Sequence, residues 1–185
     1  MIYPIVAYGD PVLRRKARNI KKDELDLEPL VKDMFETMYS AHGVGLACPQ
    51  IGKPLRMFVV DGEPMDEEMA DFKRVIINPV ILDSHGELWP FEEGCLSIPG
   101  IREDVMREHD IIIRYLDQHW QQQEEHLDGL RARIVQHEYD HIEGVLFTDH
   151  LSNFKKRILK GKLASITKGK VDIDYKMRFP VKTRN

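Results

Sequence analysis

The stretch His137-Glu138-Tyr139-Asp140-His141 organises the fold that we expect from this sequence, because it places two metal ligands on a predicted helix. Leu130, Ile134 and the two histidines follow one another at steps of four, three and four residues, so on a helix they share one face. Both imidazoles can then reach one ion, with Glu138 beside it. A metal lowers the pKa of its water to about 7, and a carboxylate can accept the proton lost as hydroxide attacks a carbonyl. The stretch predicts a metal-dependent hydrolase.

A third ligand separates a metal site from a chance occurrence of this short pattern, in which both histidines would be ordinary core or surface residues. Phe147 stands where the long metzincin pattern has its third histidine. No glutamate follows Glu143, which excludes a thermolysin-like downstream ligand. Asp149 and His150 are the remaining close downstream candidates, but both follow the predicted end of the helix. An upstream cysteine, Cys95, is the better third ligand.

Two other segments contain residues suited to a site. Cys95 lies in residues 92–100, where glycines and a proline let the backbone approach a metal or ligand closely, although a lone cysteine is usually a small buried hydrophobe. Residues 43–50 join a predicted helix to a predicted strand. Their glycines could bring backbone amides to a substrate, and the Gln50 amide could donate to a developing oxyanion. Taken alone, this second segment is equally a turn after a helix.

The flanking sequence predicts an α+β fold, with antiparallel or mixed sheets around the central H-E-x-x-H helix and with N-terminal and C-terminal helices. The N-terminal helix follows Asp26, a candidate cap, carries one apolar stripe and ends near His42. The polar, acidic composition of residues 61–71 predicts an exposed loop. Three apolar segments rich in branched residues predict strands: residues 55–60, 75–82 and 111–116.

Ser152 is the candidate cap of a last helix, whose lysines would stay in water. Its apolar side consists of Phe154, Ile158, Leu159, Leu163 and Ile166. Residues 171–175 alternate enough to predict a short strand. We therefore expect one catalytic metallohydrolase domain over residues 1–168, including a basic C-terminal helix from about residue 152, and a tail over residues 169–185.

The charge of the chain is unevenly distributed. Residues 151–185 hold eleven Lys and Arg against Asp172 and Asp174, a net charge of +9, so the first 150 residues carry −13 of the total of −4. Clustered positive charge favours a polyanionic partner such as RNA. The plainer interpretation is a solvated helix face.

Composition and cysteine usage point to the cytoplasm. The chain is 42% hydrophobic and 31% charged, as soluble globular proteins are, and has no apolar run long enough to cross a bilayer. Its start lacks the features of a secretory signal, so we expect a cytoplasmic protein without a membrane partner. In that compartment Cys48 and Cys95 are expected to be two thiols rather than a disulfide.

Together, three segments resemble the peptide deformylase family, whose motifs are G-x-G-L-A-A-P-Q, E-G-C-L-S and Q-H-E-x-D-H in that order. Here they correspond to residues 43–50, 93–97 and 136–141, and the entry segment at residues 5–14 is also similar to the family's start. The resemblance covers most of residues 5–150. It implies hydrolytic removal of the formyl group from the N-terminal methionine of newly made polypeptides, with release of formate.

The resemblance also implies a metal centre. By match to the motifs, Cys95, His137 and His141 would hold the ion, and Glu138 would be the general base and then the acid that protonates the leaving amine. Glu93 is a candidate for supporting a ligand. Family members commonly use iron(II), so one Fe2+ per chain is expected, and zinc, nickel or cobalt can occupy the same site.

The remaining implied roles concern the substrate, a formyl-methionyl nascent peptide. Gln50 and the Leu96 amide would stabilise the tetrahedral oxyanion. Gly45 would contact the formyl end, while Val44 and Gly43 would border the methionine pocket. The basic C-terminal helix fits this interpretation, because a positive helix could dock on ribosomal RNA.

The sequence departs from the family at two positions, and two rival interpretations remain. Cys48 stands where the motif usually has Ala, and Arg133 stands where an apolar pocket residue is expected. A metallopeptidase of different specificity is the nearest rival, although the context of Cys95 argues against it. A binding module with a structural metal is the other, and it would normally have four protein ligands.

Overall fold

The computed structural model describes residues 1–180 and forms an α+β fold, as the sequence predicts. In chain order the main elements are β1 (Ile5–Val6), α1 (Leu27–Ser40), β2 (Gly45–Ala47), β3 (Met57–Asp61), β4 (Lys73–Cys95), β5 (Ile98–Leu116), β6 (Gln122–Asp128), α2 (Gly129–Ile142), α3 (Asn153–Thr167) and β7 (Met177–Arg178). Within the described range no helix is both long and apolar enough to cross a membrane.

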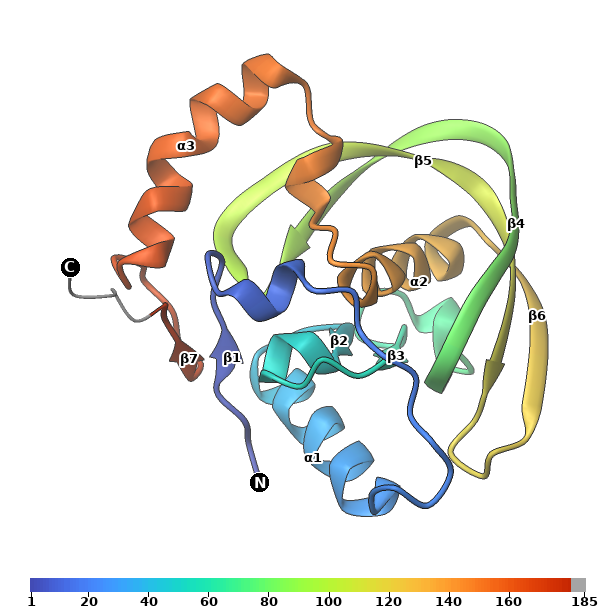
Figure 1. The fold of residues 1–185 in the computed structure, drawn as a ribbon. Helices are drawn as coiled ribbons and strands as arrows, with labels where there is room; N and C mark the ends of the chain where they lie inside the picture. The colour runs from blue at the N-terminus through green and yellow to red at the C-terminus, as the bar shows by residue number, and fades with distance from the viewer. Residues whose placement is uncertain (181–185) are drawn as a thin grey trace.

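One antiparallel sheet, in the order β2-β3-β4-β5-β6, dominates the molecule. Strands β4 and β5 form a long hairpin in which Ile77 pairs with Leu116 at the base and Cys95 with Ile98 at the tip. Register shifts along this hairpin are bulges, which bend strands and increase their twist. Because of this bending the hairpin and β6 curve around α2 (Figure 1).

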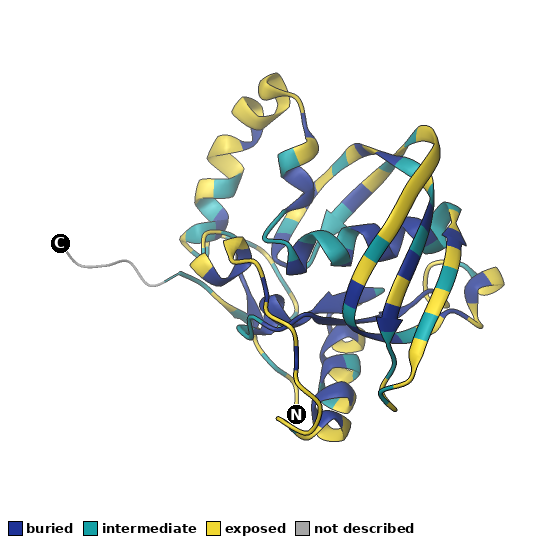
Figure 2. Ribbon diagram, turned by 45° about the vertical axis from the view of Figure 1, so that its right-hand side comes forward, coloured by how far each residue is buried: buried dark blue, intermediate teal, exposed yellow. Residues whose placement is uncertain are grey.

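Helix α2 packs inside that curve through apolar residues that face the sheet. Its Ala132, Val135 and Ile142 are fully buried and belong to one hydrophobic cluster with Ile111 and Ile113 of β5. The strands alternate buried and exposed residues, so their inner face meets the helix while the outer face meets solvent (Figure 2). Burial of each large aliphatic side chain contributes about 1.5–3 kcal/mol, and this packing fixes the position of the helix that carries the histidines.

The predicted N-terminal helix is confirmed. Helix α1 buries its apolar stripe in a second cluster with β2 and β3, and it ends at Ser40, two residues before His42. His42 has a φ of +59°, a backbone conformation that does not continue a helix. Asp26 occupies the N-cap position as predicted, but its side chain makes no capping hydrogen bond.

All three predicted strands are present: residues 55–60 correspond to β3 at Met57–Asp61, and the other two predictions were too short. Residues 75–82 and 111–116 are only the apolar parts of β4 and β5, which continue through polar residues. Strand β6 was missed because Leu127 is its one buried residue. Residues 61–71 form a mostly exposed loop as predicted, although Met69 is buried and anchors it.

Helix α3 begins as predicted, with the Ser152 side chain accepting a hydrogen bond from the Lys155 amide. Its predicted apolar side is only partly correct. Leu159 and Ile166 are buried, but Phe154 is 65% exposed and Ile158 is 62% exposed. The helix packs on the body through one narrow stripe, which leaves these two side chains in solvent.

The short strand of the tail lies further along than predicted. Residues 171–175 form no strand; β7 follows them and pairs in parallel with β1, joining Ile5 to Met177 and Val6 to Arg178. Residues 172–175 instead line a cavity described below. Residues 181–185 of the predicted tail lie outside the described part of the chain.

Candidate active site

The three predicted metal ligands come together at the tip of the long hairpin. Cys95 is the last residue of β4, while His137 and His141 lie one turn apart on α2. One ligand atom from each lies within 4.8 Å of the others, and Cys95 Sγ is 3.3 Å from His141 Nε2. The two imidazoles are 5.2 Å apart, ring centre to ring centre. Residues more than forty positions apart in sequence thus form one compact donor set.

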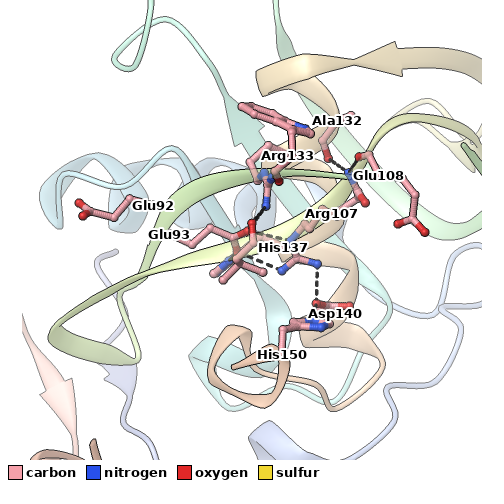
Figure 3. Close-up of polar contacts among 12 residues, drawn as sticks. Glu92, Glu93, Arg107, Glu108, Ala132, Arg133, His137, Asp140 and His150 are labelled. Carbon is pink, nitrogen blue, oxygen red and sulfur yellow. Dashed lines mark hydrogen bonds and ion pairs between the residues drawn. The ribbon is translucent and has the colours of Figure 1, made fainter. Parts of the chain in front are cut away.

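Glu93 orients the first histidine. Its Oε1 lies 2.8 Å from His137 Nδ1, and the Arg107 and Arg133 guanidinium groups donate to the same carboxylate at 2.7–3.0 Å (Figure 3). Burial opposes ionisation, but these hydrogen bonds outweigh it and hold the pKa of Glu93 well below its ordinary value. With Nδ1–H donated to a carboxylate, the Nε2 lone pair of His137 is free to bind a metal.

Cys95 is prepared for ionisation by its surroundings. Burial alone would raise its pKa, but the nearby imidazoles of His141 and His137 lower the pKa of the thiol to about 5. A thiolate, rather than a thiol, is the form that binds metals.

Glu138 points into the same cavity from α2. Its carboxylate is buried, which raises the pKa of Glu138 above its ordinary value. Within residues 1–180 no group hydrogen-bonds to Glu138 Oε2. Gly45 lies against this carboxylate, because a Cβ at position 45 would stand 2.5 Å from Glu138 Oε1. The carboxylate is therefore held by close packing on one side and has a free oxygen on the other.

Gln50 lies beside the cysteine. Its Oε1 accepts from the Ala47 amide at 2.9 Å, which leaves the side-chain amino group to donate toward the site. That group lies 3.2 Å from Ser97 Oγ and 3.6 Å from Cys95 Sγ. Leu96 follows the cysteine in the turn between β4 and β5 and also lines the cavity. Two donors of the predicted oxyanion site thus border the donor set.

These residues line a cavity of about 750 Å³. Gly43, Val44 and Gly45 line it as well, so the nine residues predicted for the site all lie at or beside it. Residues 172–175 form a further wall that the sequence did not predict. Within it, Tyr175 donates from its hydroxyl to the Leu96 carbonyl at 2.7 Å.

The two departures from the family motifs have different surroundings. Cys48 is fully buried, and burial raises the pKa of its thiol to about 12, so it does not share the reactivity of Cys95. Arg133 is buried with its guanidinium over the Trp89 ring, and it donates to the carbonyls of Trp89 and Val105 as well as to Glu93. It lines the cavity where an apolar residue was expected.

Sequence reasoning missed the residues that support the site from β5 and from the end of α2. Arg107 bridges Glu93 and Asp140, with its Nη1 2.9 Å from Asp140 Oδ2, and His150 Nε2 lies 2.8 Å from the same oxygen (Figure 3). Asp140 lies within the H-E-x-x-H stretch and could have been singled out there. Arg107 belongs to no motif, and its only signal is that a charged residue occupies an inward-facing strand position.

The donor set fits a divalent transition metal. One thiolate and two imidazoles are ligands that Zn2+ and iron(II) accept, and three protein ligands leave a position open. The uncompensated buried oxygen of Glu138 beside them is the second observation in favour, because a buried carboxylate normally has a partner. The other described donor cluster, His85, Asp110 and His126, contains no thiol.

Comparison with known proteins agrees with this geometry. The model of the polypeptide deformylase family matches residues 2–157. The peptide deformylase of Cytophaga hutchinsonii is 57% identical over 183 residues, covering 98% of this chain and 100% of that protein. The peptide deformylase of Christiangramia forsetii is 56% identical over 190 residues, covering 97% of each.

A solved structure shows the same arrangement of the backbone. The crystal structure of peptide deformylase from Thermus thermophilus superposes with a TM-score of 0.83 at 41% identity, covering 91% of this chain and 99% of that one. The residues matched by the family model include the whole hairpin and the central helix, so motifs, fold and full-length similarity agree: the chain belongs to the polypeptide deformylase family.

Proposed function

We propose that Cys95, His137 and His141 hold one iron(II) ion, and that Glu138 moves the proton during hydrolysis. The chain is a polypeptide deformylase, a hydrolase that removes the N-formyl group from nascent polypeptides. The observation that carries the proposed roles is the convergence of the three donors within 4.8 Å beside the buried Glu138 carboxylate. A divalent ion held by these donors would polarise the formyl carbonyl and lower the pKa of water.

Glu138 would act twice in this reaction. Its carboxylate accepts a proton from the water whose oxygen forms the new bond to the formyl carbon. The carbon–nitrogen bond then breaks, its electron pair stays on the nitrogen, and Glu138 delivers the proton there, so that formate and a free amine leave. The raised pKa of Glu138 brings it closer to the working pH, where an acid and base of this kind is most effective.

Gln50 and the Leu96 amide would stabilise the negative charge that develops on the formyl oxygen. Gln50 is suited to this role because its own oxygen is already occupied by the Ala47 amide, which fixes the amino group as the donor facing the site. The roles proposed for Gly43, Val44 and Gly45 are to admit the formyl end and to border the methionine side chain. Close approach there needs small residues, and Gly45 has no room for a Cβ.

The test is release of formate from a short formyl-methionyl peptide by anaerobically purified, iron-loaded protein, with Glu138→Ala as the matched variant. We expect the variant to bind the metal but to lose nearly all activity. Formate release that survives in the variant would overturn the role of Glu138. Fully metallated, folded protein that releases no formate but cleaves unformylated peptides would favour a metallopeptidase.

The identity of the metal is a separate part of the proposal. Thiolate and imidazole ligands accept iron(II), zinc, nickel and cobalt alike, so ligand type does not choose between them. We propose iron(II), and the test is elemental analysis of protein purified without oxygen from cells grown without added metal. Iron at one ion per chain is the expected result, and zinc in its place would refute this part of the proposal.

We also propose that α3 docks on the ribosome, which would place the enzyme in the cytoplasm beside its nascent substrates. Lys156, Arg157 and Lys160 are exposed on this helix, and none of them takes part in an ion pair with the described residues. The exposed Phe154 and Ile158 lie among them, and apolar side chains of this size in solvent favour a contact surface over a purely solvated face. Lys155 is different, because it pairs with Glu103 at 2.6 Å.

Charge reversal at Lys156, Arg157 and Lys160 tests the docking surface without breaking that ion pair. Co-sedimentation with ribosomes should fall steeply in this triple variant and should weaken with added salt in the native protein. Reversal of the exposed Lys21 and Lys22, which lie outside α3, is the control and should have little effect. Equal co-sedimentation of native and triple-variant protein would favour the solvated-face interpretation.

A further inference from the structure

A second group of potential metal ligands lies on the outer face of the sheet. His85 of β4 pairs directly with Asp110 of β5, and Asp110 in turn pairs with Asp128 of β6. His126 lies two residues before Asp128, so its side chain is on the same face of the sheet. This face of β4, β5 and β6 is turned to solvent (Figure 2). Three neighbouring strands thus present His85, Asp110 and His126 side by side.

The distances within this group suit a small cation. One ligand atom from each of the three side chains lies within 4.8 Å of the others, and His126 Nε2 is 2.8 Å from Asp110 Oδ1. The rings of His85 and His126 are stacked with their centres 5.5 Å apart. Two ligands of a tetrahedral zinc ion, each about 2.0–2.2 Å from the metal, are about 3.3 Å apart. The 2.8 Å between His126 Nε2 and Asp110 Oδ1 is shorter than this value, and exposed side chains need only small rotations to reach it.

Two of the three candidate ligands already have the partners that metal ligands usually have. Asp83 Oδ2 accepts from His85 Nδ1 at 2.9 Å, which leaves the Nε2 lone pair of that ring free. His109 Nδ1 lies 2.7 Å from Asp110 Oδ2 and fixes the carboxylate from the other side. The glycine at position 86 leaves room for the Asp110 carboxylate, because a Cβ there would stand 2.8 Å from Asp110 Oδ2.

The carboxylate of Asp110 is also in the right ionisation state. Hydrogen bonds from His109 and then from His126 hold the pKa of Asp110 below its ordinary value, so it is an anion at neutral pH. His126 Nε2 lies 2.8 Å from Asp110 Oδ1. A divalent cation bound between these atoms and His85 would meet two imidazoles and one carboxylate, with water completing the coordination.

We propose that His85, Asp110 and His126 form a second metal site, which binds a divalent transition ion, zinc in the first instance, apart from the catalytic centre. Two imidazoles with one carboxylate suit zinc, nickel and copper better than calcium or magnesium, which prefer oxygen ligands alone. The absence of a thiol from the group and its exposure to solvent distinguish it from the catalytic set. Binding there should be weaker and should exchange readily with solution.

Occupation of this site would tie three strands together where the catalytic helix begins. Helix α2 starts at Gly129, three residues after His126, and His109 Nε2 is 3.9 Å from the Cβ position of that glycine. A ligand that binds only the folded state stabilises that state, and the stabilisation grows with the logarithm of the ratio of ligand concentration to dissociation constant. Zinc should therefore raise the melting temperature of protein whose catalytic site is already filled.

The experiment uses the full chain loaded with one zinc ion in the catalytic site and then dialysed against free zinc. The native protein should take up a second ion per chain. The double variant His85→Asn, His126→Asn should keep the first ion and its deformylase activity. Removing only a hydrogen-bond partner of a ligand typically weakens metal affinity about 10- to 100-fold, so we expect removal of two ligands to weaken the second site at least as much.

The control is His119→Asn, which removes an exposed histidine outside the group. It should bind the second ion as the native protein does, and zinc should raise its melting temperature equally. NMR of the histidine ring protons locates the ion, because those of His85 and His126 should shift on its addition while those of His119 stay unchanged. Absence of a second ion in native protein, or its persistence in the double variant, would overturn the proposal and leave a hydrogen-bonded cluster only.

Discussion

Replacement of Gly45 by alanine would test how closely the fold positions the catalytic carboxylate. A Cβ at this position would stand 2.5 Å from Glu138 Oε1 and 2.8 Å from both Cδ and Cγ of the same side chain. Glu138 is only 5% exposed, so its carboxylate has little free space into which to move. The clash is with the group proposed to transfer the proton, and it should affect kcat in particular.

The size of the effect follows from the overlap. Ordinary van der Waals contact begins at 3.4 Å, so a contact of 2.5 Å has to open by about 0.9 Å. Misplacement of a reacting group by about 1 Å can reduce the rate about 100-fold, which corresponds to about 2.7 kcal/mol of activation free energy. We expect Gly45→Ala to lower kcat by roughly this factor, with the metal still bound.

The assay is formate release at saturating substrate, together with the metal content and melting temperature of each variant. A double-mutant cycle separates the carboxylate from other effects of the methyl group. In a Glu138→Ala background the clash is gone, so adding Gly45→Ala should reduce the residual rate no further. Gly161→Ala on α3 is the matched glycine control, because nothing lies within 4 Å of its Cβ position.

Two results would refute this reasoning. One is a metallated Gly45→Ala enzyme with more than half of the native kcat, because the carboxylate would then move without cost. The other is a further large loss of rate when Gly45→Ala is added to Glu138→Ala, because the methyl group would then act on substrate binding or on the metal.

Three other predictions concern stability and thiol reactivity. In metal-free protein, iodoacetamide should alkylate Cys95 at a rate nearly independent of pH between about pH 6 and about pH 8, because its thiolate is already formed above its pKa of about 5. Cys48, whose pKa is raised to about 12, should react only after unfolding, and labelling followed by peptide mass analysis checks both expectations. Arg107→Met should lower the free energy of unfolding by about 3–5 kcal/mol, because it removes two hydrogen bonds from the buried carboxylate of Glu93. A loss under about 1 kcal/mol in urea denaturation would contradict the role of this ion pair. Gly161→Ala should raise the free energy of unfolding by up to about 1 kcal/mol, since it replaces an exposed mid-helix glycine with a better helix former, and unchanged or lower stability in the same assay would show that α3 unfolds separately.

The sequence predicted best where one local pattern determines the structure. Helix α2 combines an apolar stripe with ligands four residues apart, so both its structure and its chemistry can be inferred from spacing. The same holds for α1 and for the Ser152 cap of α3. These features depend on neighbours within one or two turns, which is the range that a sequence pattern reports.

Features that depend on distant partners were not predictable in the same way. The polar halves of β4 and β5 are strands because each pairs with the other, and no apolar alternation marks them. Arg107 is buried only because Glu93 and Asp140 meet it from two other elements. Tyr175 became part of the cavity wall through pairing of β7 with β1, at the opposite end of the chain. Arg107 and Asp140 lie 33 residues apart, and β1 and β7 lie at opposite ends of the chain, so no short window of sequence contains both members of either pair.

The pairing of β1 with β7 gives this enzyme a fixed order of completion during its own synthesis. A ribosome adds about 5–20 residues per second, so β7 emerges roughly 10–30 s after the strand with which it pairs. When α2 has just emerged from the ribosome, the nascent chain already contains Cys95, His137 and His141, but it still lacks the wall formed by Tyr175. A transcript truncated before that residue would therefore yield a protein that can collect metal around an incomplete cavity.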